Sequence, residues 1–331
     1  MAKKLISRGH SVTLFAAGGS DPALGAQMLL PERLELSAAA RSDVGAMPVD
    51  WMQQHHAYLG LMLHLAESKD FDVIHNNSLH HLPVALSSLV PMPVLTTLHT
   101  PPTPWLESAT NYAAPSAVFT AVSSATAKAW ASSVTSSVIP NGVDTDVWHP
   151  GPGGNECVWT GRLVPEKAPH LAIDAARAAG RSITLAGPIM DRSYFEAQVA
   201  PRLGDDAVYV GHLRHTELVE LVGSSAVAVV SSQWDEPYGL VAAEAMSCGT
   251  PVAAFPRGGL VEIVTDSSGA LAADGSVAAL AEAITRAADC DRGAVRQRAE
   301  GSLSLERMVD EYEQLYARMA MQPTSQPSAS A

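Results

Sequence analysis

Short apolar runs alternate with alanine-rich stretches along most of this chain. The runs are rich in Val and Ile, as expected for buried strands of a parallel sheet, and the stretches between them have helical spacing. The pattern predicts a first series of strands at residues 12–15, 72–75, 94–98, 117–122 and 138–139. It predicts a second series at residues 157–160, 183–186, 208–210, 226–230 and 252–255. Helices are predicted at residues 2–7, 51–67, 168–179, 217–222, 277–288 and 305–319. Two open α/β domains result.

Turn-forming residues cluster between the two series, from residue 139 to residue 154. This segment contains Asn141-Gly142 and Gly153-Gly154, which favour a linker over regular structure. We therefore predict a first domain over residues 1–143 and a second over 144–303. Residues 304–320 form a helix with one apolar stripe, and residues 321–331, rich in Pro, Ser and Ala, are expected to be disordered.

Composition narrows the class of protein. The chain has 331 residues, of which 47% are hydrophobic and 17% charged, enough to bury the cores of two domains. Its formal charge of -13 disfavours nucleic acid and anionic membrane surfaces as partners. No apolar run reaches the roughly 18 residues of a membrane span. Cys157, Cys248 and Cys290 are widely spaced, which argues against a disulfide framework and for a reducing, cytoplasmic location.

Two glutamates flank the start of a short predicted helix. Gly239 and Gly249 bracket an alanine-rich segment, so Glu236 lies in the loop at the positive end of the helix and Glu244 about one turn inside it. Backbone N–H groups at such an end attract phosphate. A ligand that combines phosphate with hydroxyls, such as a nucleotide sugar, fits this arrangement. Taken alone, Glu244 is equally well explained as a solvated helix residue.

Arg162 and Lys167 follow the first strand of the second domain. Ligands of open parallel sheets collect beyond the carboxyl ends of strands, and this cationic pair suits two linked phosphates. The alternative is that Arg162 pairs with Glu166 across a surface turn. Two Asp-x-Asp sequences, at residues 144–146 and 289–291, lie in a turn and between two helical stretches, so we expect no metal site there.

Together these segments resemble the signature of the fourth family of retaining glycosyltransferases. The resemblance rests on Gly-Arg-Leu and Glu-Lys within residues 161–167, Glu-Pro-Tyr-Gly-Leu at 236–240, Glu244, and Cys-Gly-Thr-Pro-Val at 248–252. It implies the GT-B fold, in which two Rossmann-like, doubly wound parallel-sheet domains face a cleft and the last helix crosses back to the first domain. It also implies a nucleotide-sugar donor on the second domain, a hydroxyl acceptor on the first, domain closure, and no metal or other cofactor. Ala168 stands where the family usually has Gly.

The resemblance also implies roles for single residues. Arg162 and Lys167 would hold the donor diphosphate, Glu236 a sugar hydroxyl, and Glu244 the ribose hydroxyls. His99 would face the donor sugar. The remaining contacts would be made largely by main chain: Gly161, Tyr238, Gly239 and Leu240 around the phosphates, and Val210, Gly211 and Leu213 at the base.

Several segments keep two interpretations. Gly258-Gly259 with Glu262 is either a simple turn or a wall of the donor pocket, and His99 is either catalytic or a hydrogen-bonded structural residue. We interpret His75, His80 and His81 as loop or acceptor-side residues. Residues 101–105, Pro-Pro-Thr-Pro-Trp, form either an acceptor wall or a rigid surface loop, and residues 123–126 resemble a helix cap.

The N-terminus departs from the family pattern. Members normally begin with one more strand and a glycine-rich loop, so we expect the complete product to start upstream and the first strand to be missing here. Alternative functions are a nucleotide-sugar epimerase and a sugar-nucleotide-binding protein without turnover. A nicotinamide dehydrogenase is disfavoured because no G-x-G-x-x-G sequence follows a first strand.

Overall fold

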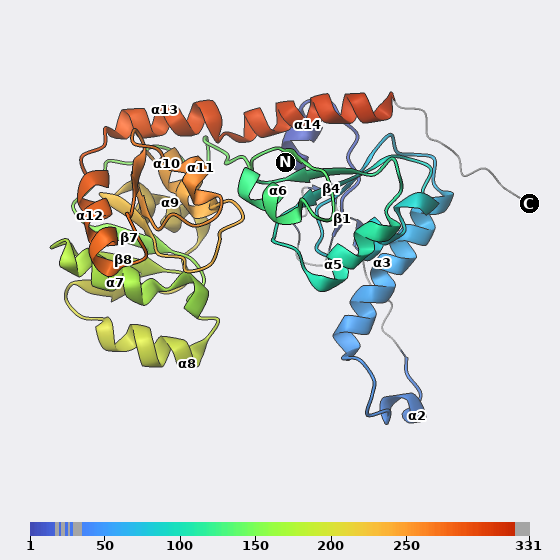
Figure 1. Cartoon of the computed structure of the whole chain (residues 1–331), viewed down its shortest axis with the longest axis horizontal. Helices are drawn as coiled ribbons and strands as arrows, with labels where there is room; N and C mark the ends of the chain where they lie inside the picture. Colours follow the sequence, from blue (N-terminus) through green and yellow to red (C-terminus); the bar gives the residue numbers. More distant parts are fainter. Residues whose placement is uncertain (17–19, 21–23, 26, 29–34, 322–331) are drawn as a thin grey trace, which may run out of the picture. The chain divides into compact units, whose positions relative to one another are not determined.

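The computed structural model describes residues 1–16, 20, 24–25, 27–28 and 35–321, which form two compact units (Figure 1). The N-terminal unit comprises residues 1–121, 127–138 and those from 309 onward. The C-terminal unit comprises residues 122–126 and 139–308. Helices α6 (Ser124–Trp130) and α14 (Leu305–Ala320) therefore each begin in the C-terminal unit and end in the N-terminal unit. Of the segment 321–331 that is predicted to be disordered, residues 322–331 lie outside the described residues.

The C-terminal unit is built on a six-stranded parallel sheet of order β12-β11-β10-β7-β8-β9. Its strands are β7 (Cys157–Thr160), β8 (Ile183–Ala186), β9 (Ala207–Tyr209), β10 (Val227–Val230), β11 (Val252–Ala254) and β12 (Gly269–Leu271). The chain proceeds outward from β7 to β9 and then returns to place β10 on the other side of β7. The loops that follow β7 and β10 diverge at this switch point.

Helices cover both faces of that sheet. They are α7 (Pro169–Ala178), α8 (Arg192–Tyr194), α9 (His215–Gly223), α10 (Leu240–Ser247), α11 (Leu260–Ile263), α12 (Val277–Ala287) and α13 (Arg292–Ser302). On one face, Ile173 of α7 and Leu280 of α12 join the core; on the other, Val219 of α9, Met246 of α10 and Val295 of α13 do so. The strands are buried on both sides, which explains why they appear in the sequence as continuous apolar runs.

The N-terminal unit contains a four-stranded parallel sheet of order β3-β4-β5-β6 and a separate parallel pair, β1-β2. The strands are β1 (Phe15–Ala16), β2 (Gln27–Met28), β3 (Ile74–Asn76), β4 (Val94–Leu98), β5 (Val118–Ala121) and β6 (Ser137–Val138). The helices are α1 (Ala2–Ser7), α2 (Ala38–Arg41), α3 (Val49–Glu67), α4 (Leu82–Ala85) and α5 (Pro104–Ala109). Met62 and Leu65 of α3 pack against Val94 of β4.

The observed fold confirms the prediction of two parallel-sheet α/β domains and corrects it at the edges. The strand predicted at residues 12–15 begins only at Phe15, and β12 was not predicted. β12 is a short edge strand that begins with Gly269. A Cβ on Gly269 would lie 2.0 Å from the carbonyl oxygen of Val252. The close approach of the two backbones therefore requires Gly at this position, and an apolar pattern does not report that requirement. Among the described residues, no helix has both the length and the apolar character needed to cross a bilayer.

Candidate functional site

Two loops meet at the switch point of the C-terminal sheet. The loop after β7 carries Arg162 and passes through a 3-10 turn, Pro165–Lys167, into α7. The loop after β10 carries Ser231 and leads to α10. The Ser231 hydroxyl accepts from the indole N–H of Trp159 at 3.1 Å and lies 3.0 and 2.9 Å from the carbonyl oxygens of Lys167 and Ala168. The two loops are therefore fastened together at their base.

Glu236 is the buried acid of this frame. Its side chain is 7% exposed, and its Oε1 accepts hydrogen bonds from Lys167 Nζ and from the hydroxyl of Ser232. The Lys167 ammonium also lies 5.1 Å from the ring centroid of Trp234. Both bonds converge on Oε1, while Oε2 has no hydrogen-bond partner among the described residues. The second oxygen can thus accept from a hydroxyl of a ligand.

The segment before α10 presents a row of backbone amides. The carbonyl of Pro237 accepts from the hydroxyls of Ser123 and Thr126, and the Tyr238 hydroxyl donates to the carbonyl of Asn141 at 2.6 Å. Gly239 adopts a left-handed φ of 106° and is the N-cap of α10. These bonds hold the Pro237 carbonyl and the Tyr238 side chain in place. The N–H groups of residues 238–240 donate to no described residue. Unpaired N–H groups at the start of a helix favour anions.

The guanidinium of Arg162 is exposed and makes no hydrogen bond or ion pair with any described residue. The alternative pairing with Glu166 across the turn is therefore not formed. Ala168, at the position where Gly was expected from the resemblance, adopts the left-handed conformation with φ of 46°. The backbone keeps the shape that Gly would give it, at some conformational cost. Arg162 is free to form a bidentate contact with a phosphate.

Glu244 lies within α10, half-buried, as the sequence pattern predicted. Burial raises the pKa of its carboxyl group to about 7, and no described residue forms an ion pair or hydrogen bond with that group. A buried carboxyl group without a partner is costly unless a ligand satisfies it. Its position inside the amide-bearing helix makes it a second acceptor for hydroxyls, separate from Glu236.

The loops after β8 and β9 continue the same edge of the sheet. A Cβ on Gly187 would lie 1.8 Å from the carbonyl oxygen of Gly161, and the Gly187 N–H donates to the carbonyl of Gly211 at 2.8 Å. The N–H of Val210 donates to the carbonyl of Leu185 at 3.0 Å. The N–H groups of Gly211 and Leu213 donate to no described residue, so this edge offers main-chain contacts to a ligand.

Glu262 has a structural task in the C-terminal unit. Its two carboxylate oxygens accept from the N–H groups of Ser124 and Ala125, each at 2.9 Å, at the start of α6. Ser123 accepts from the Thr126 N–H at 3.0 Å, as expected for the cap predicted at residues 123–126. Gly258 approaches the backbone of the Glu236 loop so closely that a Cβ would lie 2.2 Å from the carbonyl oxygen of Glu236.

In the N-terminal unit, His99 follows β4 and is half-buried. Its Nε2 lies 3.0 Å from Asn77 Oδ1, and burial lowers its pKa. His75 lies in a strand, as predicted for residues 72–75. It lies in β3 with both ring nitrogens engaged, Nδ1 at 2.6 Å from the Tyr316 hydroxyl and Nε2 at 2.7 Å from the Thr97 hydroxyl. Burial, with a smaller contribution from His99, lowers the pKa of His75 to about 3.

The aspartates of both Asp-x-Asp sequences act in local backbone structure. Asp144 Oδ1 accepts from the N–H groups of Asp146 at 3.1 Å and Val147 at 3.3 Å. Asp291 Oδ1 accepts from the Ala294 N–H at 2.8 Å and caps α13. These contacts agree with the turn and helix-boundary positions inferred from the sequence.

Comparison with known families accounts for nearly the whole chain. The family described as "Glycosyl transferases group 1" matches residues 149–302, and "Glycosyltransferase Family 4" matches residues 1–147. The chain belongs to glycosyltransferase family 4. The chain is 36% identical over 177 residues to glycogen synthase of Mycobacterium tuberculosis. That match covers 50% of this chain and 42% of the relative, so the aligned part spans less than half of the curated protein.

Solved structures share the fold of the family 4 chain. Sucrose-phosphate synthase from Thermosynechococcus elongatus superposes with a TM-score of 0.73 at 21% identity, covering 96% of this chain and 91% of that one. HepE of Anabaena, solved with UDP and glucose, gives a TM-score of 0.67 at 20% identity, covering 80% of this chain and 82% of that one. At these identities the likeness establishes the GT-B fold.

Two neighbours of the Lys167–Glu236 pair escaped the sequence analysis. Ser232 hydrogen-bonds to the Glu236 carboxylate, and Trp234 lies beside Lys167. A serine after a buried strand is common and gives no signal by itself. The available clue was position: Ser232 and Trp234 lie between the end of β10 and Glu236, in the loop that the switch point places beside Arg162.

Proposed function

We propose that this chain transfers a sugar from a nucleoside-diphosphate sugar to an acceptor hydroxyl, with retention of the anomeric configuration. One observation carries the proposal. The C-terminal unit combines the backbone N–H groups of residues 238–240 and the Arg162 guanidinium, which bond to no described residue, with the Lys167–Glu236 ion pair. Phosphate groups are the anions that such a combination of amides and cationic side chains binds.

In the proposed reaction, the bond between the anomeric carbon and the diphosphate oxygen breaks, and its electron pair leaves with the diphosphate. The acceptor oxygen bonds to the same face of the anomeric carbon, and its proton passes to the departing diphosphate. Arg162, Lys167 and the helix-end amides stabilise the negative charge that develops on the leaving group. This step uses the donor as co-substrate and assigns no role to a metal or other cofactor.

The two acids are assigned different hydroxyl groups. Glu236 Oε2 would accept from a hydroxyl of the donor sugar, while Glu244 would accept from the ribose. The main chain at Gly161 would contact the phosphates, and that at Val210, Gly211 and Leu213 the base. Main-chain contacts do not select one base over another. We propose UDP-sugars as the first donors to test, because HepE was solved with UDP. The three free cysteines suit a reducing compartment, and we propose that the enzyme acts in the cytoplasm.

The test measures nucleoside diphosphate release from a panel of nucleotide sugars, with and without hydroxyl acceptors. Release that depends on an acceptor, with a product whose anomeric configuration by NMR equals that of the donor, supports the proposal. Interconversion of the donor without acceptor would identify an epimerase. Binding of nucleotide without any turnover would identify a binding protein.

Arg162→Ala is the sharpest variant in this test. Charged hydrogen bonds contribute about 1.5–3 kcal/mol, so its loss should lower donor affinity or turnover by roughly one to two decades. Arg214→Ala is the matched control, because Arg214 is also exposed in the C-terminal unit but pairs with Glu217. Unchanged affinity and turnover in Arg162→Ala would reject the assignment. The proposal assigns His99 to the donor sugar, so His99→Ala should reduce turnover while nucleoside diphosphate affinity is kept.

A further inference from the structure

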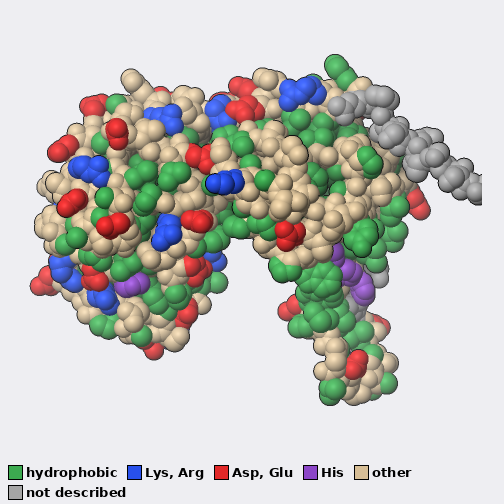
Figure 2. Space-filling view, viewed as in Figure 1, with side chains coloured by type: hydrophobic (Ala, Val, Ile, Leu, Met, Phe, Trp, Pro, Cys, Tyr) green, Lys and Arg blue, Asp and Glu red, His purple; other side chains and the backbone are tan. Residues whose placement is uncertain are grey.

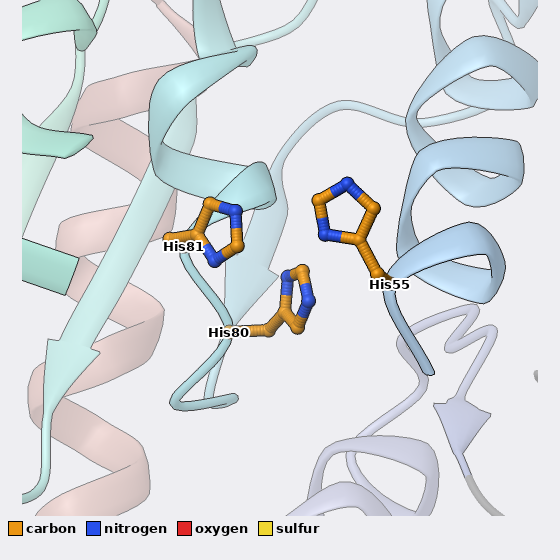
Figure 3. A group of neighbouring side chains, drawn as sticks. All are labelled: His55, His80 and His81. Carbon is orange, nitrogen blue, oxygen red and sulfur yellow. The ribbon is translucent and has the colours of Figure 1, made fainter. Parts of the chain in front are cut away.

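Three histidines gather in the N-terminal unit, none of which is assigned above to the donor. His55 lies on α3, His80 in the loop that follows β3, and His81 at the N-cap of α4. Figure 3 shows the three rings turned toward one another across the gap between these elements. Histidine side chains reach the surface in the region of α3 in the space-filling view (Figure 2).

The geometry brings the ligand atoms of these side chains together. One nitrogen from each ring can be chosen such that all three lie within 4.8 Å of one another. The ring centroids are 4.4 Å apart for His80–His81, 5.3 Å for His55–His81 and 5.5 Å for His55–His80. We propose that His55, His80 and His81 bind a divalent transition-metal ion, with Zn²⁺ as the preferred ion.

An orphaned atom supports this proposal independently of the ring positions. His55 Nδ1 is buried and has no hydrogen-bond partner among the described residues. A buried polar atom without a partner is unfavourable, and a bound cation would satisfy it. His80 differs from His55 because its Nδ1 has a partner: it accepts from the Leu82 N–H at 3.2 Å. A metal ion bound at that nitrogen would replace this weak contact.

Two of the three imidazoles, those of His80 and His81, have lowered pKa values. Burial, together with His81 and His55, lowers the pKa of His80 to about 4. Burial and His55 also lower the pKa of His81. An imidazole nitrogen that carries no proton can offer its lone pair to a cation. Neutral imidazoles suit Zn²⁺, Ni²⁺ and Co²⁺, whereas Mg²⁺ and Ca²⁺ prefer oxygen ligands.

Aromatic neighbours already orient the three rings. Trp51 stacks on His55 with an interplanar angle of 12°, Tyr58 stacks on His80 at 11°, and Trp105 lies 4.9 Å from His81. Zn–N bonds of about 2.0–2.1 Å require ligand nitrogens about 3.3 Å apart in a tetrahedral site. The rings must therefore move together by no more than roughly 1.5 Å. Three protein ligands leave the fourth position to water or to an oxygen of a bound molecule.

The plainer explanation is that these histidines only extend an aromatic surface cluster. The sequence gave no metal signal, because His55 precedes His80 by 25 residues and no regular ligand spacing links them. The two explanations differ in one measurable property, the binding of one metal ion per chain by these imidazoles.

The experiment uses the full chain, treated with chelator and then titrated with ZnCl₂ by isothermal calorimetry. His55→Ala and His80→Ala should each weaken Zn²⁺ binding by at least about tenfold. His56→Ala is the matched control, since His56 is the exposed neighbour of His55 on α3. The control should bind Zn²⁺ like the unaltered chain.

A second measurement needs no substitution and guards against misfolded variants. Long-range proton–nitrogen NMR spectra of the unaltered chain should show Zn²⁺ shifting the imidazole nitrogens of the three histidines, while that of His170 in the C-terminal unit stays in place. Absence of one-to-one Zn²⁺ binding overturns the proposal. Binding that survives both His55→Ala and His80→Ala, or shifts only other histidines, overturns it as well. Neither measurement depends on glycosyl transfer.

Discussion

Replacing Glu244 by glutamine tests the electrostatic account of the donor site. The carboxyl group is half-buried in α10, has no partner among the described residues, and its pKa is raised by burial from 4.5 to about 7. Glutamine has nearly the same shape and is neutral at every pH. The substitution therefore removes the burial of a charge and leaves the packing in place.

The sign of the pH effect follows from proton binding. Below pH 4.5 the carboxyl group is protonated in both the folded and the unfolded chain, and its burial carries no charge penalty. Between pH 4.5 and 7 the unfolded chain loses the proton first, so stability falls as pH rises, and the loss is complete above pH 7. A pKa of about 7 against 4.5 corresponds to about 3 kcal/mol. Glu244→Gln should thus be more stable than the unaltered chain by about 1 kcal/mol at pH 5 and about 3 kcal/mol at pH 8.

Urea unfolding followed by circular dichroism between pH 5 and pH 8.5 measures this difference. Glu220→Gln is the matched control, because Glu220 is exposed on α9 and should give a difference that does not vary with pH. A Glu244→Gln difference that is equal at pH 5 and pH 8 would refute the reasoning. The same variant should bind nucleoside diphosphate about tenfold more weakly at pH 8, because a charged acceptor for the ribose hydroxyls is lost.

Three further substitutions separate stability from ligand binding in the C-terminal unit. Lys167→Met leaves buried Glu236 without its cation and should lower the free energy of unfolding by about 3 kcal/mol, measured in urea. Adding Glu236→Gln should restore most of the lost stability. A double variant that recovers no stability would contradict the role of the ion pair. Gly239→Ala forces a left-handed φ on a residue whose Cβ would lie 2.6 Å from Leu260 Cδ2, so we expect about 1–3 kcal/mol lower stability by the same method, with weaker nucleotide binding. Intact affinity for nucleotide in that variant would argue against the amide row. Glu262→Ala removes the acceptor for two N–H groups of α6 and should cost about 1–2 kcal/mol while calorimetric nucleotide affinity stays unchanged; a lower affinity would place Glu262 at the ligand after all.

Central strands were the most predictable part of the fold. The bounds of β4, β7 and β8 coincide with apolar runs in the sequence, because these strands are buried on both faces and their sequence is set by burial alone. Helix α10 was also predicted from its bracketing glycines. Edge strand β12 escaped because Gly269 is selected by close approach to Val252, a requirement that no apolar pattern reports.

Candidate site residues were found where local sequence fixes local geometry. Glu236 before the helix and Glu244 within it follow from the positions of Gly239 and Gly249, and Arg162 follows from the end of a strand. The side-chain partners of His75 were not predicted, because Tyr316 and Thr97 are distant from it in sequence.

By itself, the sequence determined most of the buried strands, the helix between Gly239 and Gly249, and the family that the chain resembles, because burial and turn chemistry act on neighbouring residues. Only the tertiary structure decided which side chains meet. Lys167 reaches Glu236 across 69 residues, Glu262 caps a helix 138 residues away, and His55 faces His80. Those partners are set by the order of strands in a sheet and by the packing of helices on it, and periodicity records that a position is buried without recording what lies opposite.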